Sequence, residues 1–598
     1  MEFNCGTINE KHIGKEITLY GWCRYIRDHG GKLFIDLADM YGTTQLVFEK
    51  EVKDKADELG KEYVISAFGV VEKRDEETID NSNPTGRVEL YVKSFEVISG
   101  SKLPPFEITE EKEKFLANED LRLEYRYLDL RRKSMISNIL FRDRVTKTVR
   151  RFFWDNGFLE METPYLVRDN YETGSRTLIV PSRIEKGKFY ALAQSPQIYK
   201  QMLMVSGFDK YFQIARCFRD EDPREDRQPE HTQIDIEVAF KDESYIQGTV
   251  EKMFQKIFKD VLGKGLTAPF PHMKYEDAVK TYGSDKPDMR FDNRIVDITR
   301  ELEGTEYNIL KRVIETKGHV KAISFNAGFD GAKGRLDKNY MLKMIELAKL
   351  FGLRGLTWLY VKNGAIHSEP ESIAESLKKS EEKIRKKLGA KNGDIIIVGA
   401  DLSEKVLLDA LGRLRKTIGE KIGIYNSDYS FIWIDEFPLF EINEVTGKLM
   451  PAHNPFTSPT GETMKFLDES PERVRGRQYD LVLNGNELGS GAIRISDPKL
   501  QRKVMKLFGM DDKTIDKNFG FFIEALSYGT PIEGGIGMGL DRITALLAGS
   551  GNIRDFILFP KNKRFESSVD TSPTSIDQKR LRNDYGLEFK EALDSTKS

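Results

Sequence analysis

A charged segment between two alternating runs contains the residue types that most readily suggest chemistry. Residues 218–237 read FRDEDPREDRQPEHTQIDIE, in which eight side chains are acidic and three are arginines. Such a mixture suits a site that holds a polyphosphate, a metal ion and a charged substrate together. A solvated loop between two strands has a similar composition. The flanking elements and partner residues elsewhere must decide between the two.

The runs on either side of this segment alternate with period two, as half-buried strands do. The first run ends in Arg219, and arginine can hold a phosphate or carboxylate with two hydrogen bonds. In the second run, 232–240, Gln233, Asp235 and Glu237 share one face. We expect an antiparallel pair that brings Arg219, Gln233 and Asp235 to one cavity.

Complementary residues recur far down the chain. Residues 478–495 contain Asp480 in a predicted strand, Glu487 after a turn, and Arg494. Two carboxylates within reach of each other suit Mg²⁺, which takes few carboxylates together with phosphate oxygens. A structural ion pair is the alternative, more so for Asp480 than for Glu487.

A glycine-rich strand that runs into a helix, GGIGMGLDRITALLAG at 534–549, places Arg542 in the first helical turn. It has neither the Lys-Ser/Thr of a P-loop nor GxGxxG spacing. Alternating glycines usually indicate close packing. Here they would also let adenine or ribose lie on the strand while Arg542 reaches the phosphates.

Two other segments offer polar side chains. Gln197 and Lys200 follow a turn at positions i and i+3, and therefore lie on one helical face. His453 lies in the loop HNPFTSP, where a lone histidine is usually a surface residue.

The bulk composition limits the class of protein. With 598 residues the chain has room for about four domains. Its apolar content of 39%, charged content of 32% and net charge of −3 indicate a soluble globular protein, in which any nucleic-acid surface is local. The three cysteines are far apart, and no signal-peptide pattern or membrane-length apolar run occurs. We therefore expect a cytoplasmic protein with no membrane partner.

The first hundred residues are predicted to form a small β-barrel of the OB type, because β-branched and aromatic runs alternate with turn residues. In KLFIDLAD the leucine and isoleucine side chains face the core and leave Phe34 outward, beside Arg27 and Gln45. An outward aromatic with polar neighbours suits base stacking and base-edge recognition. An ordinary barrel with one surface phenylalanine is the alternative.

Helical periodicity predicts a helix from about residue 136 to Asn156-Gly157, followed by a strand that ends at Pro164. Residues 101–120 contain prolines and many charges, and are predicted to be a linker. Near 393–419 the pattern predicts a buried strand, a turn and an amphipathic helix.

These segments resemble a known family. FRDED with TQIDIE resembles motif 2 of the class II aminoacyl-tRNA synthetases, GGIGMGLDR resembles motif 3, and the helix that ends in FLEMETP resembles motif 1. The segments QSPQIYKQ, RYLDLR, YGSDKPDMR and HNPFTSP are more specific, and resemble the bacterial type of aspartyl-tRNA synthetase. The resemblance covers nearly the whole chain, including VGAD at 398–401 in the family's inserted domain.

The resemblance implies a ligase that activates L-aspartate with ATP and Mg²⁺ and transfers it to the 3′ end of tRNA-Asp. It implies a homodimer and an α+β multidomain fold with an antiparallel catalytic sheet. The implied parts are an OB-fold anticodon-binding barrel (1–104), a linker or hinge (105–135), a catalytic domain in two parts (136–289 and 426–562), an inserted α/β domain (290–425) and a C-terminal extension (563–598).

The resemblance also implies residue roles, with Arg219, Arg542 and Glu487 as the catalytic groups. ATP would contact Arg219, Asp220, Glu221, Gln228, His231, Glu487, Gly539, Leu540, Asp541 and Arg542. Aspartate would contact Glu172, Gln197, Lys200, Arg219, Gln233, Asp235, His453 and Arg494. The metal ligands would be Asp480 and Glu487, and the anticodon would meet Arg27, His29, Phe34 and Gln45.

The residue chemistry agrees with this reaction. Adenylate formation joins a carboxylate to an α-phosphate, and its barrier falls when arginines and Mg²⁺ neutralise charge and align the attack. Arg494 and Lys200 suit an acidic substrate side chain, because neutral asparagine would leave a buried charge unpaired. They oppose a lysine or asparagine synthetase. A catalytically silent paralog or a multidomain RNA-binding scaffold is the remaining alternative.

Four positions depart from the usual pattern or affect partner choice. The stretch around Glu172 is one residue longer than the family's Thr-Pro-Glu-Gly-Ala-Arg, His231 stands where a phenylalanine usually stacks on adenine, and Glu533 stands where the family often has histidine. His29, in RDHGG, resembles the non-discriminating members, which charge both tRNA-Asp and tRNA-Asn.

Overall fold

The computed structural model describes residues 3–29, 31–110, 116–169, 176–220, 222, 227–329, 336–443, 446–447, 449–452 and 454–588. Its contacts divide the chain into two compact units. The first comprises 1–144, 222–228 and 544–577, and the second comprises 145–221, 229–543 and 578–598. Within the described part of the chain, no helix is long and apolar enough to cross a membrane.

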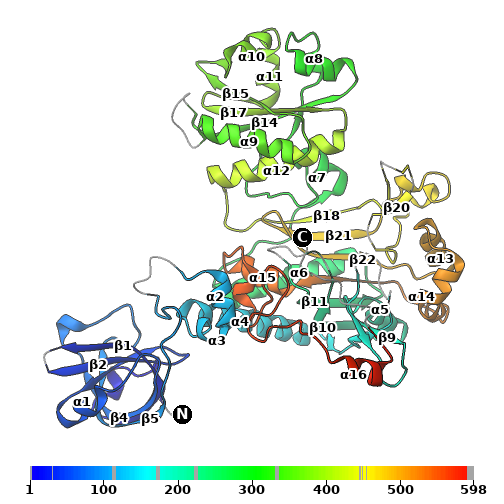
Figure 1. The fold of residues 1–598 in the computed structure, drawn as a ribbon. Coiled ribbons are helices and arrows are strands. Elements are labelled where there is room, and N and C mark those ends of the chain that lie inside the picture. Colours follow the sequence, from blue (N-terminus) through cyan, green and yellow to red (C-terminus); the bar gives the residue numbers. More distant parts are fainter. Residues whose placement is uncertain are drawn as a thin grey trace. The chain divides into compact units, whose positions relative to one another are not determined.

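The first unit begins with the predicted barrel, which is confirmed (Figure 1). Its strands close in the order β1-β2-β3-β5-β4. Their bounds are β1 (Glu16–His29), β2 (Lys32–Ala38), β3 (Thr43–Phe48), β4 (Val64–Lys73) and β5 (Val88–Ser99), with the short helix α1 (Lys50–Ala56) after β3. In β2 the buried Leu33, Ile35 and Leu37 alternate with the half-buried Phe34 and Asp36, as predicted.

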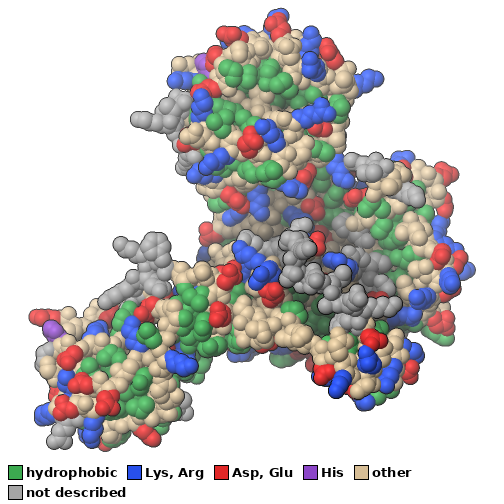
Figure 2. All heavy atoms as spheres, in the orientation of Figure 1, with side chains coloured by type: hydrophobic (Ala, Val, Ile, Leu, Met, Phe, Trp, Pro, Cys, Tyr) green, Lys and Arg blue, Asp and Glu red, His purple; other side chains and the backbone are tan. Residues whose placement is uncertain are grey.

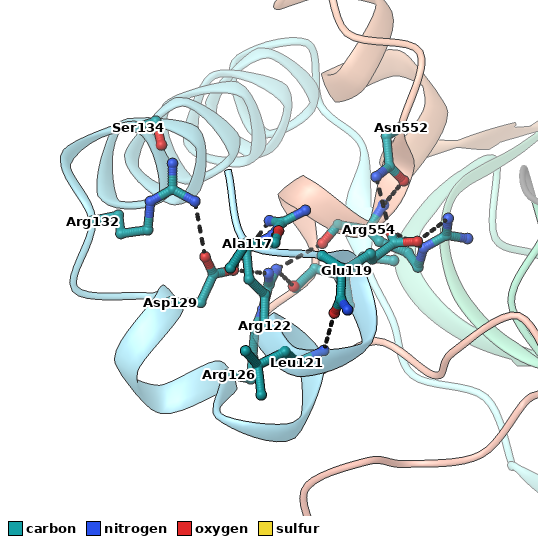
Figure 3. Close-up of polar contacts among 12 residues, drawn as sticks. Ala117, Glu119, Leu121, Arg122, Arg126, Asp129, Arg132, Ser134, Asn552 and Arg554 are labelled. Carbon is teal, nitrogen blue, oxygen red and sulfur yellow. Dashed lines mark hydrogen bonds and ion pairs between the residues drawn. The ribbon is translucent and has the colours of Figure 1, made fainter. Parts of the chain in front are cut away.

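The predicted linker contains two short helices, α2 (Glu119–Glu124) and α3 (Arg126–Asp129). Its charges are paired within the unit (Figure 3). The buried Arg126 guanidinium donates to the carbonyls of Arg554, Ile557 and Leu558 at 2.7, 2.8 and 2.9 Å, and lies 2.7 Å from Asp129. These buried partners hold this part of the predicted linker or hinge (105–135) in a defined structure.

The predicted long helix is α4 (Lys133–Asp155), and it ends where Gly157 adopts a φ of 75°. The strand predicted to continue to Pro164 is wrong in length, because β6 covers only Leu159–Glu160. After one further bond from Met161 N to Phe212 O, pairing stops, and the Thr163 hydroxyl donates to the Gln213 side chain instead. Proline then has no N–H to continue the ladder.

The second unit contains an eight-stranded sheet in the order β12-β18-β21-β22-β23-β11-β10-β6. Its internal pairs are antiparallel, and only β12-β18 and β10-β6 at the two edges are parallel. The bounds are β10 (Lys210–Phe218), β11 (Glu230–Ala239), β12 (His272–Lys274), β18 (Phe431–Asp435), β21 (Gln478–Leu483), β22 (Asn486–Ile493) and β23 (Glu533–Gly539). The predicted antiparallel catalytic sheet is thus confirmed.

Helices and two small sheets complete this part of the second unit. The helices are α5 (Gln197–Val205), α6 (Glu243–Ile257), α7 (Tyr275–Tyr282), α13 (Pro498–Leu507), α14 (Asp512–Leu526) and the first half of α15 (Leu540–Leu547), whose residues 544–547 belong to the first unit. One small sheet has the order β7-β9-β8, with β7 (Leu166–Val167), β8 (Ile179–Pro181) and β9 (Phe189–Leu192). The other pairs β19 (Phe440–Ile442) with β20 (Leu449–Pro451).

The predicted inserted domain has its own sheet, in the order β13-β14-β17-β15-β16, with helices on both faces (Figure 1). The bounds are β13 (Val296–Asp297), β14 (His319–Asn326), β15 (Thr357–Lys362), β16 (Ala365–Ser368), β17 (Asp394–Asp401), α8 (Asn308–Glu315), α9 (Lys338–Leu350), α10 (Glu371–Ser376), α11 (Glu381–Leu388) and α12 (Glu404–Ile422). Ile395 and Ile397 pack on the side of α9 and α12, whereas Ile396 and Val398 pack on the other side. The run DIIIV is uninterrupted because both faces of its strand are buried.

Candidate active site

The hairpin β10-β11 has the predicted antiparallel pairing. Gln213 lies opposite Asp235, and Ala215 lies opposite Gln233. Arg219 directly follows β10, and its backbone N–H donates to Pro229 O at 2.8 Å. The apolar residues on the opposite face of each strand hold the hairpin in the sheet, and the polar face carries the side chains predicted to bind ligands.

A buried charge cluster (Lys200, Asp235, Glu237, Arg494 and Glu533) lies beside this hairpin. Lys200, from α5, is 3.1 Å from Asp235 and 3.2 Å from Glu237, both on β11. Arg494, just after β22, uses Nε and Nη2 on the two Glu237 oxygens, at 2.9 and 3.3 Å. Removing these groups from water is costly, so each charge depends on its partners. Glu237 therefore holds together the two cations predicted to bind the substrate side chain.

The two carboxylates that are predicted to bind a metal, Asp480 and Glu487, lie on the paired strands β21 and β22. Burial, and then the nearby Glu487 carboxylate, raise the pKa of Asp480 well above its usual value. Glu487 Oε2 lies 2.7 Å from Lys286 Nζ, which comes from the loop after α7. A bulge between Leu481 and Val482 interrupts the pairing of the two strands between these carboxylates. Two close carboxylates, one of them buried, are a donor set that fits Mg²⁺.

The glycine-rich strand β23 combines close packing with open space. A Cβ on Gly535 would lie 2.0 Å from Ile236 O and 2.1 Å from Glu237 Oε2, so this glycine is required by packing. A Cβ on Gly539 would meet nothing closer than 3.8 Å. Beyond the strand, Arg542 Nη1 donates to Glu487 O at 2.7 Å, and Asp541 accepts from Thr232 N at 2.9 Å.

His231, on β11, is held neutral. Burial, and then the nearby Arg219 guanidinium, lower its pKa to about 4. Its Nε2 lies 3.3 Å from the Gln233 amide nitrogen. A neutral imidazole ring has the flat apolar face that stacking on adenine requires.

Other predicted ligands have structural partners or lie outside the described residues. Gln228 donates to Lys561 O at 3.0 Å and accepts from Lys561 N at 2.8 Å, so both its amide atoms bind backbone. Asp220 N donates to Arg176 O at 3.2 Å. Gln197 begins α5, and its buried Nε2 has no hydrogen-bond partner among the residues described. The predicted ligands that lie outside the described residues are Glu172, Glu221 and His453.

In the barrel, the predicted anticodon residues lie on neighbouring strands. Arg27 on β1 pairs in register with Phe34 on β2, and its Nη2 lies 2.6 Å from Asp36 and 3.1 Å from Gln45 Oε1. His29 is exposed at the end of β1, opposite Lys32. On the face shown in Figure 2, acidic and basic side chains are interspersed over the barrel, so any RNA-binding patch is local.

Comparison with known proteins identifies the family. A model described as class II tRNA synthetases (D, K and N) matches residues 118–563, and a model of an OB-fold nucleic-acid-binding domain matches residues 17–98. A relative named aspartate–tRNA(Asp/Asn) ligase, from Caldanaerobacter subterraneus, is 41% identical over 97% of this chain and 96% of its own. The chain belongs to the aspartate–tRNA ligase family.

Relatives of the synthetase have two kinds of name. One from Treponema denticola, an aspartate–tRNA(Asp/Asn) ligase, is 43% identical over 96% of this chain and 97% of its own. One from Macrococcus caseolyticus, an aspartate–tRNA ligase, is 41% identical over 96% of each chain. The predicted family, fold class and enzyme class are confirmed, and the silent RNA-binding alternatives are set aside.

Solved structures share the fold of the synthetase. Asparaginyl-tRNA synthetase from Pyrococcus horikoshii has a TM-score of 0.58 at 18% identity, covering 93% of this chain and 97% of its own. A putative aspartyl-tRNA synthetase from Leishmania major has a TM-score of 0.56 at 20% identity, covering 92% of each chain. These likenesses concern the fold alone.

Sequence reasoning did not assign two residues of the synthetase's site. Glu237 shares a strand face with Gln233 and Asp235, and that shared face was a sufficient signal for including it. Lys286 belongs to YGSDKPDMR, which was used only as a family signature. Its contact with Glu487 joins residues 201 positions apart, and nothing in the local pattern indicated that contact.

Proposed function

We propose that this synthetase activates L-aspartate with ATP to aspartyl-adenylate and transfers the aspartyl group to the 3′ end of tRNA-Asp and of tRNA-Asn. The observation that carries the proposal is the link from Lys200 through Glu237 to Arg494. Two buried cations held in fixed positions by Glu237 favour a substrate with an acidic side chain. Lysine would meet like charge there, and asparagine has no carboxylate with which to pair either cation.

In this proposal each charged group has a separate task. Arg219 binds the α-phosphate and the substrate α-carboxylate, and Arg542 binds the distal phosphates of ATP. Asp480 and Glu487 would hold Mg²⁺, which neutralises phosphate charge when bound. Lys286 Nζ lies 2.7 Å from Glu487 Oε2, so the lysine and the metal would both contact the Glu487 carboxylate. No side-chain nucleophile is needed, because the substrate α-carboxylate itself attacks the α-phosphorus of ATP, and pyrophosphate leaves as the α–β phosphoanhydride bond breaks.

We also propose that the barrel binds the anticodon through Arg27, His29, Phe34 and Gln45. The half-buried ring of Phe34 can stack on a base, and Arg27 and Gln45 lie beside it for base edges. The exposed His29 supports recognition of both tRNAs. From its motif 1 the synthetase is proposed to be a homodimer, and its buried free cysteines, Cys5, Cys23 and Cys217, suit the cytoplasm.

The test is charging of purified tRNA-Asp and tRNA-Asn, side by side, with labelled aspartate, ATP and Mg²⁺. We expect the wild type to charge both, and His29→Ala to lose tRNA-Asn more than tRNA-Asp. His272→Ala is the matched control, because His272 is an exposed histidine outside the barrel. Charging of tRNA-Asp alone would contradict the broader tRNA range, and charging of neither would reject the proposed function.

A further inference from the structure

Glu533 is an unexplained acid in the buried charge cluster. It begins β23 and has no exposed surface. Neither Oε1 nor Oε2 has a hydrogen-bond partner among the described residues. An ionised carboxylate in that position would carry a large desolvation cost, so burial favours the neutral acid.

The neighbours of Glu533 come from four elements. On β11 it lies opposite Ala239, which places its side chain on the face of Glu237. Its carbonyl accepts from Arg494 N at 2.9 Å, beside β22. Lys200 faces it from α5, and α6 packs on β23 through Ile246. The acid nearest the start of α6, Glu243, is held by Arg477 with two bonds of 2.6 Å.

Counting charges shows why the protonation state matters for binding. The cluster has two cations, Lys200 and Arg494, and three carboxylates, Asp235, Glu237 and Glu533. If all were ionised, the cluster would be net negative and would repel a substrate carboxylate. Burial, and then the nearby Glu237, raise the pKa of Glu533 well above its usual value, although Arg494 and Lys200 oppose the shift. With Glu533 neutral and Asp235 ionised, the charges of the cluster balance. Burial also raises the pKa of Asp235, although Lys200 opposes the shift, and protonation of Asp235 would leave the cluster net positive.

We propose that Glu533 is a specificity-determining residue, which is protonated in the folded synthetase and donates a hydrogen bond to the side-chain carboxylate of the bound substrate. This inference rests on the proposed aspartate activity. It also explains how a chain with glutamate at this position can accept an anion: the acid supplies a donor and no charge. An ionised Glu533 would instead accept a hydrogen bond from the amide of asparagine.

Two variants with side chains similar in size to glutamate test whether position 533 needs a hydrogen-bond donor. Glu533→Gln keeps a neutral hydrogen-bond donor, whereas Glu533→Met keeps the size and removes the donor. In aspartate-dependent ATP–pyrophosphate exchange near neutral pH, we expect the KM for aspartate in E533Q to stay within about threefold of wild type. In E533M it should rise by about tenfold or more, with a smaller change in kcat. Glu251→Gln, a buried acid bonded to Phe270 N and Trp433 Nε1, controls for the loss of a buried carboxylate.

Infrared difference spectroscopy tests the proton directly. The spectrum of wild type minus E533Q should contain the C=O band of a protonated carboxylic acid, and E533H gives the same subtraction if E533Q does not fold. Absence of that band would overturn the proposal. So would equal KM values for E533Q and E533M, or an E533Q that prefers asparagine. If wild type shows no aspartate-dependent exchange, the proposed function fails, while the infrared band still reports the state of Glu533.

Discussion

At the scale of the residue, Glu237 is the group that joins the two buried cations. Replacing it with glutamine would leave Lys200 and Arg494 buried with one carboxylate fewer. We expect Glu237→Gln to lower the free energy of unfolding by about 3 kcal/mol, as breaking a buried ion pair does. The KM for aspartate should rise at least about tenfold.

Urea denaturation and ATP–pyrophosphate exchange measure these two effects. Glu243→Gln is the control, because it breaks the half-buried pair with Arg477 and should cost about 1 kcal/mol or less. If the two variants lose similar stability and E237Q keeps the wild-type KM, Glu237 does not organise the cations.

His231 gives a prediction about pH. Its pKa is lowered to about 4 in the folded protein, against 6.5 in the unfolded chain, so the unfolded chain binds more protons between these values. Stability should therefore fall as pH drops from about 6.5 to about 4. The variant His231→Phe should lack this component, which is about 3 kcal/mol.

Denaturation of both proteins across that pH range tests this. The difference in unfolding free energy between H231F and wild type should grow as the pH falls, and a constant difference would show that His231 titrates normally. The KM for ATP should not vary between about pH 6 and 8 through this residue, because the ring stays neutral there.

Individual site residues differed in how far the sequence could predict them. Strand alternation placed Gln233 and Asp235 on one face, and the same rule applies to Glu237. Gln228 could not be predicted in this way, since its amide binds the backbone of Lys561, 333 residues away. Long-range pairs of this kind leave no periodic signal.

At the scale of the element, the glycines of β23 differ in how closely neighbouring atoms approach them. Gly535→Ala would place a methyl group 2.0 Å from Ile236 O, in the middle of the sheet. We expect a loss of about 3 kcal/mol or more, or failure to fold, because backbone cannot move away there. Gly539→Ala should lose about 1 kcal/mol or less, as its Cβ has at least 3.8 Å of space.

Thermal unfolding of the two alanine variants provides the comparison. Equal losses would mean that strand conformation, and not crowding by Ile236 and Glu237, requires glycine. The sequence predicted that β23 exists and that its glycines approach other groups. It could not indicate which glycine is crowded, because that depends on register with β11 and β22.

Linker segments also show the limits of sequence patterns at this scale. Prolines and charges in 101–120 predict a linker, and the resemblance extends it as a linker or hinge over 105–135, but neither indicates that residues 118–132 fold around Arg126. Its guanidinium binds carbonyls more than 400 positions away in the sequence (Figure 3). A buried arginine that caps distant carbonyls looks the same in sequence as an exposed one.

At the scale of the whole molecule, the account assigns RNA recognition and amino-acid activation to different domains. Arg27→Ala removes a guanidinium from the barrel, where it contacts Asp36 and Gln45. We expect the KM for tRNA to rise about tenfold, while aspartate-dependent exchange without tRNA stays unchanged.

The exposed Arg87, which lies 3.8 Å from Glu10 elsewhere on the barrel, supplies the control Arg87→Ala. A similar rise in KM for this variant would indicate general attraction of RNA to basic residues, not a local anticodon surface. A change in exchange by R27A would contradict the separation of the two tasks.

The predicted order of domains rests on differences in periodicity along the chain and on where the family motifs fall. The inserted domain was predicted as α/β from its strand–turn–helix pattern, and the predicted strand and helix are present as β17 and α12. The antiparallel pairing of β17 with β14 and β15 was not predictable from the sequence. Both faces of β17 are buried, so its residues show no apolar–polar alternation from which the register with a neighbouring strand could be inferred.

The central claim is that a buried pair of cations selects an acidic substrate. The most direct measurement is ATP–pyrophosphate exchange without tRNA, with aspartate, asparagine and lysine as separate substrates. The account predicts exchange with aspartate and at least about 100-fold lower kcat/KM for the other two. Comparable exchange with asparagine or lysine would contradict it.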